Sequence, residues 1–173
     1  MNMINFQPHY IEGMKHFLES VLGEEKTLYV LEIGSGFSTP WLASRAYKVY
    51  TIEHDAAWYE ASERWISGVY NVSLNLVPRY WETFINEINR GFDIVIADGA
   101  DEEGARVAVM KAVWRWVNPG GWLFVDDTDR EEYSEGVKFL DSLGWPKVSW
   151  FGEDIYGRKG RVDAYYRLPS FQI

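Results

Sequence analysis

The chain has 173 residues and no cysteine, which excludes a disulfide framework, a cysteine-ligated zinc site and a thiol nucleophile. Its length fits one domain over residues 1–173. With 26 acidic and 17 basic residues its net charge is −9, so its surface repels phosphate backbones and we expect no nucleic-acid partner. We recognise no signal peptide and no run of ~20 apolar residues, and therefore expect a cytoplasmic protein without a membrane partner.

Amphipathic patterns alternate with apolar runs along the chain. Helical spacing predicts a leading helix over 9–22, within a leading segment 1–24. Apolar runs then predict five strands, at 28–33, 48–53, 72–77, 92–98 and 122–127. The helices expected between them cover 40–46, 55–68, 81–88 and 107–117, and Asn118-Pro119-Gly120-Gly121 is a strong signal to end the last of these.

The end of the chain departs from this alternation. A helical pattern from Tyr133 to Leu140 ends at Gly144, and strands are expected at 147–151 and 162–168 with only a polar loop between them. These two strands should form a hairpin and place one antiparallel strand in a mainly parallel, doubly wound α/β sheet. Ligands of such sheets bind outside the carboxyl ends of the strands.

A glycine loop follows the first predicted strand. Gly34 and Gly36 allow a tight turn and let a ligand approach bare backbone, and Thr39 is expected as the N-cap of the next helix. Glu53, at the end of the second strand, is where an acid can accept both hydroxyls of a ribose. A dinucleotide fingerprint would have a third glycine where Thr39 stands, and Glu32 would repel a pyrophosphate but suits a ligand with an amino group.

The acid-x-Gly-x-Gly pattern with a second acid after the next strand resembles the class I S-adenosylmethionine-dependent methyltransferases over residues 25–168. Further matching segments are Glu53-His54-Asp55, Asp98-Gly99-Ala100, Pro119-Gly120-Gly121 and Val125-Asp126-Asp127-Thr128. The resemblance implies a Rossmann-like seven-stranded sheet of order 3-2-1-4-5-7-6 with strand 7 antiparallel. It also implies S-adenosylmethionine as cofactor, its methionine end on the glycine loop, its ribose on Glu53 and its sulfonium near Asp98. The expected cofactor-binding residues are Glu32, Gly34, Ser35, Gly36, Ser38, Glu53, His54, Asp98 and Gly99.

Three carboxylates, Asp98, Asp126 and Asp127, end two neighbouring predicted strands. They should cluster, and three oxygen ligands suit a magnesium-class ion. The arrangement is similar to that of metal-dependent O-methyltransferases of the catechol and caffeoyl-CoA type. However, Asp127 stands where those enzymes have asparagine, and Asp101 where catechol enzymes carry a lysine base. The alternative is that Asp98 touches the cofactor while the later aspartates cap the following turn and helix.

The catalytic residue is not identified by the sequence. Methyl transfer mainly requires that nucleophile and methyl group are aligned, so a base is optional. The candidates are Asp98, Asp101, Asp127, Tyr133 and His54. Tyr80 and Trp81 either flank an adenine or pack in a helix.

The acceptor is expected to be a small molecule with a hydroxyl or carboxyl nucleophile. Its binding surface must come from residues 1–24, 98–106, 128–132 and 152–161, or from the second subunit of a homo-oligomer. In the last of these ranges Arg158, Lys159 and Arg161 either meet an acidic substrate or form a solvated hairpin tip. Two other classes stay open: a nicotinamide or flavin enzyme, and a non-catalytic S-adenosylmethionine-binding or interaction module.

Overall fold

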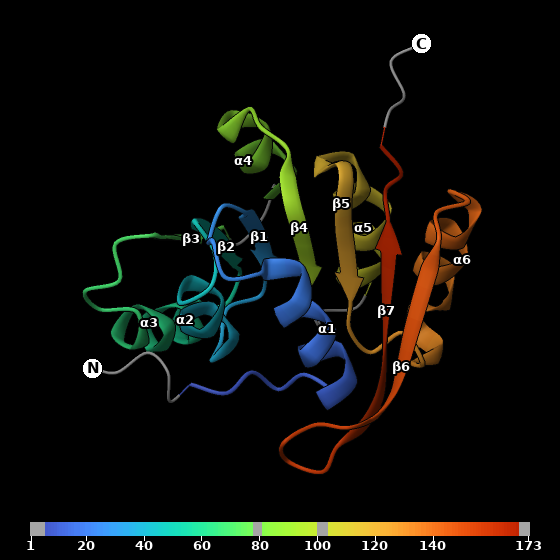
Figure 1. Ribbon diagram of the computed structural model, residues 1–173, viewed down its shortest axis with the longest axis horizontal. Coiled ribbons are helices and arrows are strands. Elements are labelled where there is room, and N and C mark those ends of the chain that lie inside the picture. The colour runs from blue at the N-terminus through green and yellow to red at the C-terminus, as the bar shows by residue number, and fades with distance from the viewer. Residues whose placement is uncertain (1–5, 78–80, 100–103, 170–173) are drawn as a thin grey trace.

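The structure is a computed structural model, and it describes residues 6–77, 81–99 and 104–169. One seven-stranded sheet forms its centre, in the order β3-β2-β1-β4-β5-β7-β6 (Figure 1). Its strands are β1 (Tyr29–Ile33), β2 (Lys48–Glu53), β3 (Val72–Leu76), β4 (Phe92–Ala97), β5 (Val117–Val125), β6 (Lys147–Glu153) and β7 (Lys159–Tyr166). Strand β7 runs antiparallel to both of its neighbours and the other pairs are parallel. The predicted fold class, strand order and terminal hairpin are confirmed.

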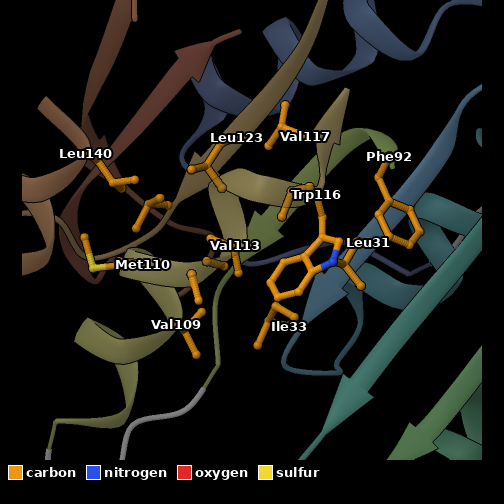
Figure 2. Close-up of a cluster of buried hydrophobic side chains, with 14 of the residues drawn as sticks. Leu31, Ile33, Phe92, Val109, Met110, Val113, Trp116, Val117, Leu123 and Leu140 are labelled. Carbon is orange, nitrogen blue, oxygen red and sulfur yellow. The ribbon is translucent and has the colours of Figure 1, made fainter. Parts of the chain in front are cut away.

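Helices cover both faces of the sheet. They are α1 (Glu12–Leu22), α2 (Ser38–Ala43), α3 (Ala56–Trp65), α4 (Trp81–Ile88), α5 (Ala105–Val113) and α6 (Ser134–Ser142), with short 3-10 helices at Trp114–Trp116 and Glu131–Tyr133. Figure 2 shows the core on one face, where α5 and α6 pack on β1, β4 and β5 through residues such as Val109, Leu31 and Leu123. The other core lies under α1 and α2 and includes Leu18 and Trp41. Burial of β1 and β4 on both faces explains their continuous apolar runs.

The start of β5 differs from the prediction. Residues 118–121 were expected to end a helix before a strand at 122, but β5 already begins at Val117. Gly120, at φ +84°, donates its N–H to the carbonyl of Arg167 beside it, and the register with β4 shifts between Phe92 and Ile94. The turn-like residues therefore form an irregular stretch inside a strand, because the adjacent segment after β7 provides hydrogen-bond partners for their backbone groups.

Two helix starts also differ from the prediction. Helix α1 begins at Glu12, three residues after the expected start, because Ile11 has an extended backbone with ψ of 135°. Helix α2 begins at Ser38, so Thr39 lies inside the helix and is not its N-cap. Within the residues that the structure describes, we find no helix with the length and apolar character needed to cross a bilayer.

The carboxyl ends of the parallel strands mark the place where a ligand is expected. In Figure 1 the arrowheads of β4 and β5 point to the lower edge of the sheet. The segment before α1 and the tip of the β6–β7 hairpin pass along this same edge, while β7 ends at the opposite edge of the sheet. The elements expected to supply the acceptor surface thus meet at the predicted ligand-binding edge.

Candidate functional site

A cavity of about 400 Å³ opens at this edge of the sheet. Its wall is built by the segment before α1, the glycine loop, α3, the ends of β4 and β5, α5 and the β6–β7 hairpin. The lining residues are His9, Ile11, Gly34 to Ser38, Trp58, Asp98, Arg106, Asp126, Asp127, Asp129, Arg130, Asp154 and Arg158 to Gly160. Seven of the predicted cofactor or metal residues of the glycine loop and strand ends are therefore brought together with segments far away in the sequence.

The two glycines of the loop have different roles. Gly34 has φ +93°, and a Cβ placed on it would lie 2.6 Å from Cα of Gly99, so the loops after β1 and β4 approach closely here. Only glycine fits that position. A Cβ on Gly36 would meet nothing nearer than Oγ of Ser38 at 3.8 Å. Gly36 keeps the cavity open, whereas Gly34 and Gly99 make the backbone crossing that supports it.

Glu32 lies beneath the loop and is fully buried. Its carboxylate accepts hydrogen bonds from the hydroxyls of Ser38 (2.6 Å), Thr39 (2.7 Å) and Thr51 (2.8 Å). Burial raises the pKa of Glu32 to about 7, against the effect of these three hydroxyl donors. The carboxylate ties β1 and β2 to the start of α2, and its donor Ser38 lines the cavity.

Glu53 is buried, and its carboxylate accepts hydrogen bonds from the protein's own backbone. One carboxylate oxygen accepts from the backbone N–H and the hydroxyl of Ser35, both at 2.8 Å. The other accepts from the backbone N–H groups of His54 (2.7 Å) and Asp55 (2.9 Å). Neither Glu53 nor His54, whose ring lies 3.1 Å from it, contributes to the cavity wall. A ribose on Glu53 stays a prediction, and binding it would require some of these donors to be displaced.

The three predicted metal ligands, Asp98, Asp126 and Asp127, all line the cavity, and each has a partner within the protein. Burial raises the pKa of Asp98 well above its usual range; the charge of Asp126 and a hydrogen bond with it add to the shift, and Arg106 opposes it. Asp127 pairs with Arg130 at 2.6 Å. Within the described parts of the chain, no group of three histidine, cysteine or acidic side chains is arranged to hold a metal ion. As they stand, the three residues do not fit a magnesium ion.

Arg106 is a site residue that the sequence did not reveal. It is 1% exposed, and its guanidinium donates to the carbonyls of Gly99, Ala97 (3.3 Å) and Asp126 (3.4 Å). It thus holds the ends of β4 and β5 together below the carboxylates. The sequence does hold one signal for this role: Arg106 is a cation on the buried face of α5, where the other buried residues are apolar.

Aromatic side chains from distant segments meet at and beside the cavity wall. The ring of His9 packs edge-on against Phe37 of the glycine loop (5.8 Å between centroids) and Tyr156 of the hairpin (4.7 Å). Trp58 donates its indole N–H to the carbonyl of Ser35. Burial lowers the pKa of His9, and Arg158 adds to this effect. None of these contacts follows from a sequence motif.

Some predicted candidates are not part of the cavity. Tyr133 is buried in the core below it, between the cations of Arg106 and Arg130. Tyr80 and Asp101, and the side chain of Trp81, lie outside the described residues, so those predictions stay open.

The three cations of the hairpin are separated by the structure. Arg158 and Lys159 line the cavity. Arg161 turns away, binding Asp163 at 2.7 Å and the hydroxyl of Ser149 at 3.3 Å. The arrangement as a whole can hold a polar ligand that carries positive charge, with bare backbone on one side and carboxylates at its centre.

Comparison with protein families decides the class of the chain. Residues 31–128, more than half of the chain and including the glycine loop and both carboxylate-bearing strand ends, match a methyltransferase domain. The chain belongs to this methyltransferase family. It is therefore an enzyme, and the interpretation as a non-catalytic module is set aside. Comparison with curated protein sequences gives no significant match.

Solved structures share the fold of this methyltransferase at low sequence identity. An O-methyltransferase from Bacillus cereus in complex with SAH is 18% identical, with a TM-score of 0.70 over 94% of this chain and 85% of that one. TomG, an O-methyltransferase from Streptomyces achromogenes in complex with SAM, is 20% identical, with a TM-score of 0.69 over 91% and 82%. An rRNA methylase from Streptococcus thermophilus is 15% identical, with a TM-score of 0.64 over 90% and 95%. These likenesses support the fold and leave the acceptor open.

Proposed function

We propose that the enzyme transfers the methyl group of S-adenosylmethionine to an oxygen atom of a small-molecule acceptor. The observation that carries this proposal is the cavity itself, in which the glycine loop Gly34 to Ser38 and the Asp98 carboxylate share one wall in a methyltransferase fold. Two proteins of the same fold are complexes with SAM or SAH. The proposed cofactor site consists of Gly34, Ser35, Gly36, Ser38 and Asp98, with Glu53 and His54 on the ribose side.

The charges of the cavity favour this cofactor over a dinucleotide. S-adenosylmethionine carries a positive sulfonium and an amino group, and the Asp98–Asp126 pair supplies negative charge beside the glycine loop. The pyrophosphate of NAD would meet the same carboxylates and be repelled. The net charge of −9 also disfavours a nucleic-acid acceptor.

The methyl group passes directly from the cofactor to the acceptor, so the protein does not need to form a covalent bond with either. The acceptor oxygen forms a bond to the methyl carbon while the carbon–sulfur bond breaks, and the sulfonium becomes a neutral thioether. The enzyme accelerates the step mainly by holding oxygen, carbon and sulfur in line. A hydroxyl acceptor also releases a proton, and the Asp98–Asp126 pair, whose side chains line the cavity, is our candidate to receive it.

A thermal shift titration with SAM, SAH and NAD tests the cofactor. Ligand at about 100 times its dissociation constant stabilises a protein by about 2.7 kcal/mol, which should raise Tm by roughly 5–10 °C for a chain of this length. We expect this shift with the two adenosyl ligands only.

The matched variant is Gly36→Val. Because a side chain at Gly36 has room in the free protein and enters the cavity, we expect an unchanged Tm without ligand and no ligand shift. If the wild-type protein shows no shift with SAM or SAH, the proposed function is wrong. If Gly36→Val still shows the full shift, the cofactor lies elsewhere. Turnover compared with and without a chelator tests the dependence on a metal ion separately.

A further inference from the structure

The two halves of the cavity wall differ in the chemistry of their side chains. Phe37 and Trp58, from the glycine loop and α3, line the cavity on the side of the proposed cofactor, and the ring of His9 contacts both Phe37 and Tyr156 of the hairpin. On the far side, over the ends of β5 and β7, the lining from ranges 126–130 and 154–160 consists of charged side chains and Gly160. An uncharged aromatic acceptor would have to desolvate these charges without offering them partners.

Most of the charges on the far side are already satisfied by one another. Asp127 pairs with Arg130 at 2.6 Å, and Asp154 pairs with Arg158 at 2.5 Å. Asp154 also accepts from the backbone N–H groups of Tyr156 (2.8 Å) and Arg158 (2.9 Å), which holds the hairpin tip in place. These pairs shape the wall and do not need a ligand.

Besides Asp126, which is hydrogen-bonded to Asp98, two opposite charges on this wall have no close counter-ion within the described parts of the chain. The Lys159 side chain is 83% exposed, and its ion pair with Glu153 is long, at 3.8 Å. Asp129 accepts one hydrogen bond, from the backbone N–H of Arg161 at 3.1 Å, and forms no ion pair with any residue in the described part of the chain. One is a cation and the other an anion, and both line the cavity.

Lys159 and Asp129 lie on the same rim. The hydrogen bond from Arg161 fixes Asp129 against β7, and Thr128 beside it donates its N–H to the carbonyl of Arg161 at 2.9 Å. Lys159 precedes Arg161 by two residues on the same strand, which is roughly 7 Å of extended chain. One small molecule in a cavity of about 400 Å³ can therefore contact both charges.

We propose that the methyl acceptor is a small zwitterion of the amino-acid type, whose anionic group binds Lys159 and whose ammonium group binds Asp129. This inference rests on the proposed function and names the acceptor class of the same site. The attacking oxygen belongs to a hydroxyl or carboxylate of that molecule. With a carboxylate, the carbon–oxygen bond forms as the carbon–sulfur bond breaks, the product is an ester, and no proton has to leave.

The test measures methyl transfer from S-adenosylmethionine to the twenty standard L-amino acids, with succinate, ethanolamine and catechol as a dianion, a cation and an uncharged aromatic diol. We expect turnover of at least one amino acid and of none of the three comparison compounds.

Two variants test the binding residues with that amino acid as substrate. Lys159→Gln and Asp129→Asn should each raise KM about tenfold, because each removes one charge-assisted hydrogen bond to the substrate, and should leave kcat within twofold. Asparagine keeps an oxygen for the Arg161 N–H, so the loop stays anchored. Lys138→Gln and Glu132→Gln, at exposed positions outside the cavity wall, are the matched controls.

Binding of SAH, measured by calorimetry on each protein, separates the two levels of the argument. If the wild-type protein does not bind SAH, the proposed function fails. If it binds SAH but methylates no amino acid, or methylates only catechol, succinate or ethanolamine, the zwitterion is wrong and the proposed cofactor stands. If an amino acid is methylated and both variants keep the wild-type KM, Lys159 and Asp129 are not its binding residues.

Discussion

At the scale of single residues, the two glutamates of the motif act first on the protein itself. Glu32 accepts hydrogen bonds from three hydroxyls of β2 and α2. Glu53 accepts hydrogen bonds from backbone N–H groups of the glycine loop and of the residues that start α3. Each therefore fixes the backbone that forms or supports the cavity wall. Their substitution by alanine would disturb the fold as well as ligand binding, so such variants are poor tests of cofactor contact.

The buried Glu32 carboxyl should make stability depend on pH. Its pKa is raised from 4.5 to about 7, so between these values the folded protein binds more protons than the unfolded chain. Stability from this group is therefore highest at low pH and is lost as pH rises through about 7. Between pH 5 and 8 the wild-type free energy of unfolding should fall by about 2–3 kcal/mol more than that of Glu32→Gln.

Urea denaturation of both proteins across this range measures the difference. Glutamine keeps the shape and one acceptor oxygen, so the comparison isolates the ionisation of Glu32. Parallel pH profiles of the two proteins would contradict a raised pKa at this position.

At the scale of elements, Arg106 joins three of them. From the first turn of α5 it reaches the carbonyls at the ends of β4 and β5, so one side chain ties α5 to the two strands that lead to Asp98 and Asp126. Its charge also opposes the rise in the pKa of Asp98. The carboxylate pair at the centre of the cavity depends on this buried cation.

Arg106→Met should destabilise the protein by about 3 kcal/mol, because it leaves buried carbonyls without their donor and removes the cation that opposes the charge of the Asp98–Asp126 pair. Thermal and urea unfolding measure the loss. Arg115→Met, an exposed arginine of the short helix after α5, should change stability by less than about 0.5 kcal/mol. Equal stability of the two variants would show that the contacts of Arg106 are not structural.

At the scale of the whole molecule, the sheet separates two cores and the leading segment closes one of them. Met14, Leu18 and Leu22 of α1 are buried against the face of the sheet that also holds α2. The residues before α1 pass along the ligand-binding edge, and His9 and Ile11 line the cavity, so this part of the chain supplies both a structural layer and part of the cavity wall (Figure 1).

Leu18→Ala should therefore cost about 3 kcal/mol of stability, since a fully buried leucine leaves a cavity between α1 and the sheet. Ser20→Ala, at an exposed position two residues further along the same helix, should change stability by less than about 0.5 kcal/mol. Urea denaturation of both variants measures the contrast. A small effect of Leu18→Ala would mean that α1 is not a required layer of the fold.

By itself, the sequence determined the type and order of the elements and the position of the glycine loop. Apolar periodicity is a local property, and it gave the helices and strands from β1 to β7 to within a few residues. The missing helix between β6 and β7 gave the hairpin, and the resemblance carried by the glycine and acidic motifs gave the strand order. The errors at β5 and α2 arose where contacts outside the local pattern, to Arg167 and Glu32, changed the role of turn and cap residues.

Only the tertiary structure decided what each polar residue has as its partner. It brought His9 and Lys159, from opposite ends of the chain, to one cavity, and turned Arg161 away from it. It gave Asp127 an arginine, where the motif suggested a metal ion. Such outcomes depend on distances between segments that are far apart in the sequence and on the loss of water around them. A carboxylate binds whichever donor lies within about 3 Å once it is buried, and no local pattern carries that information.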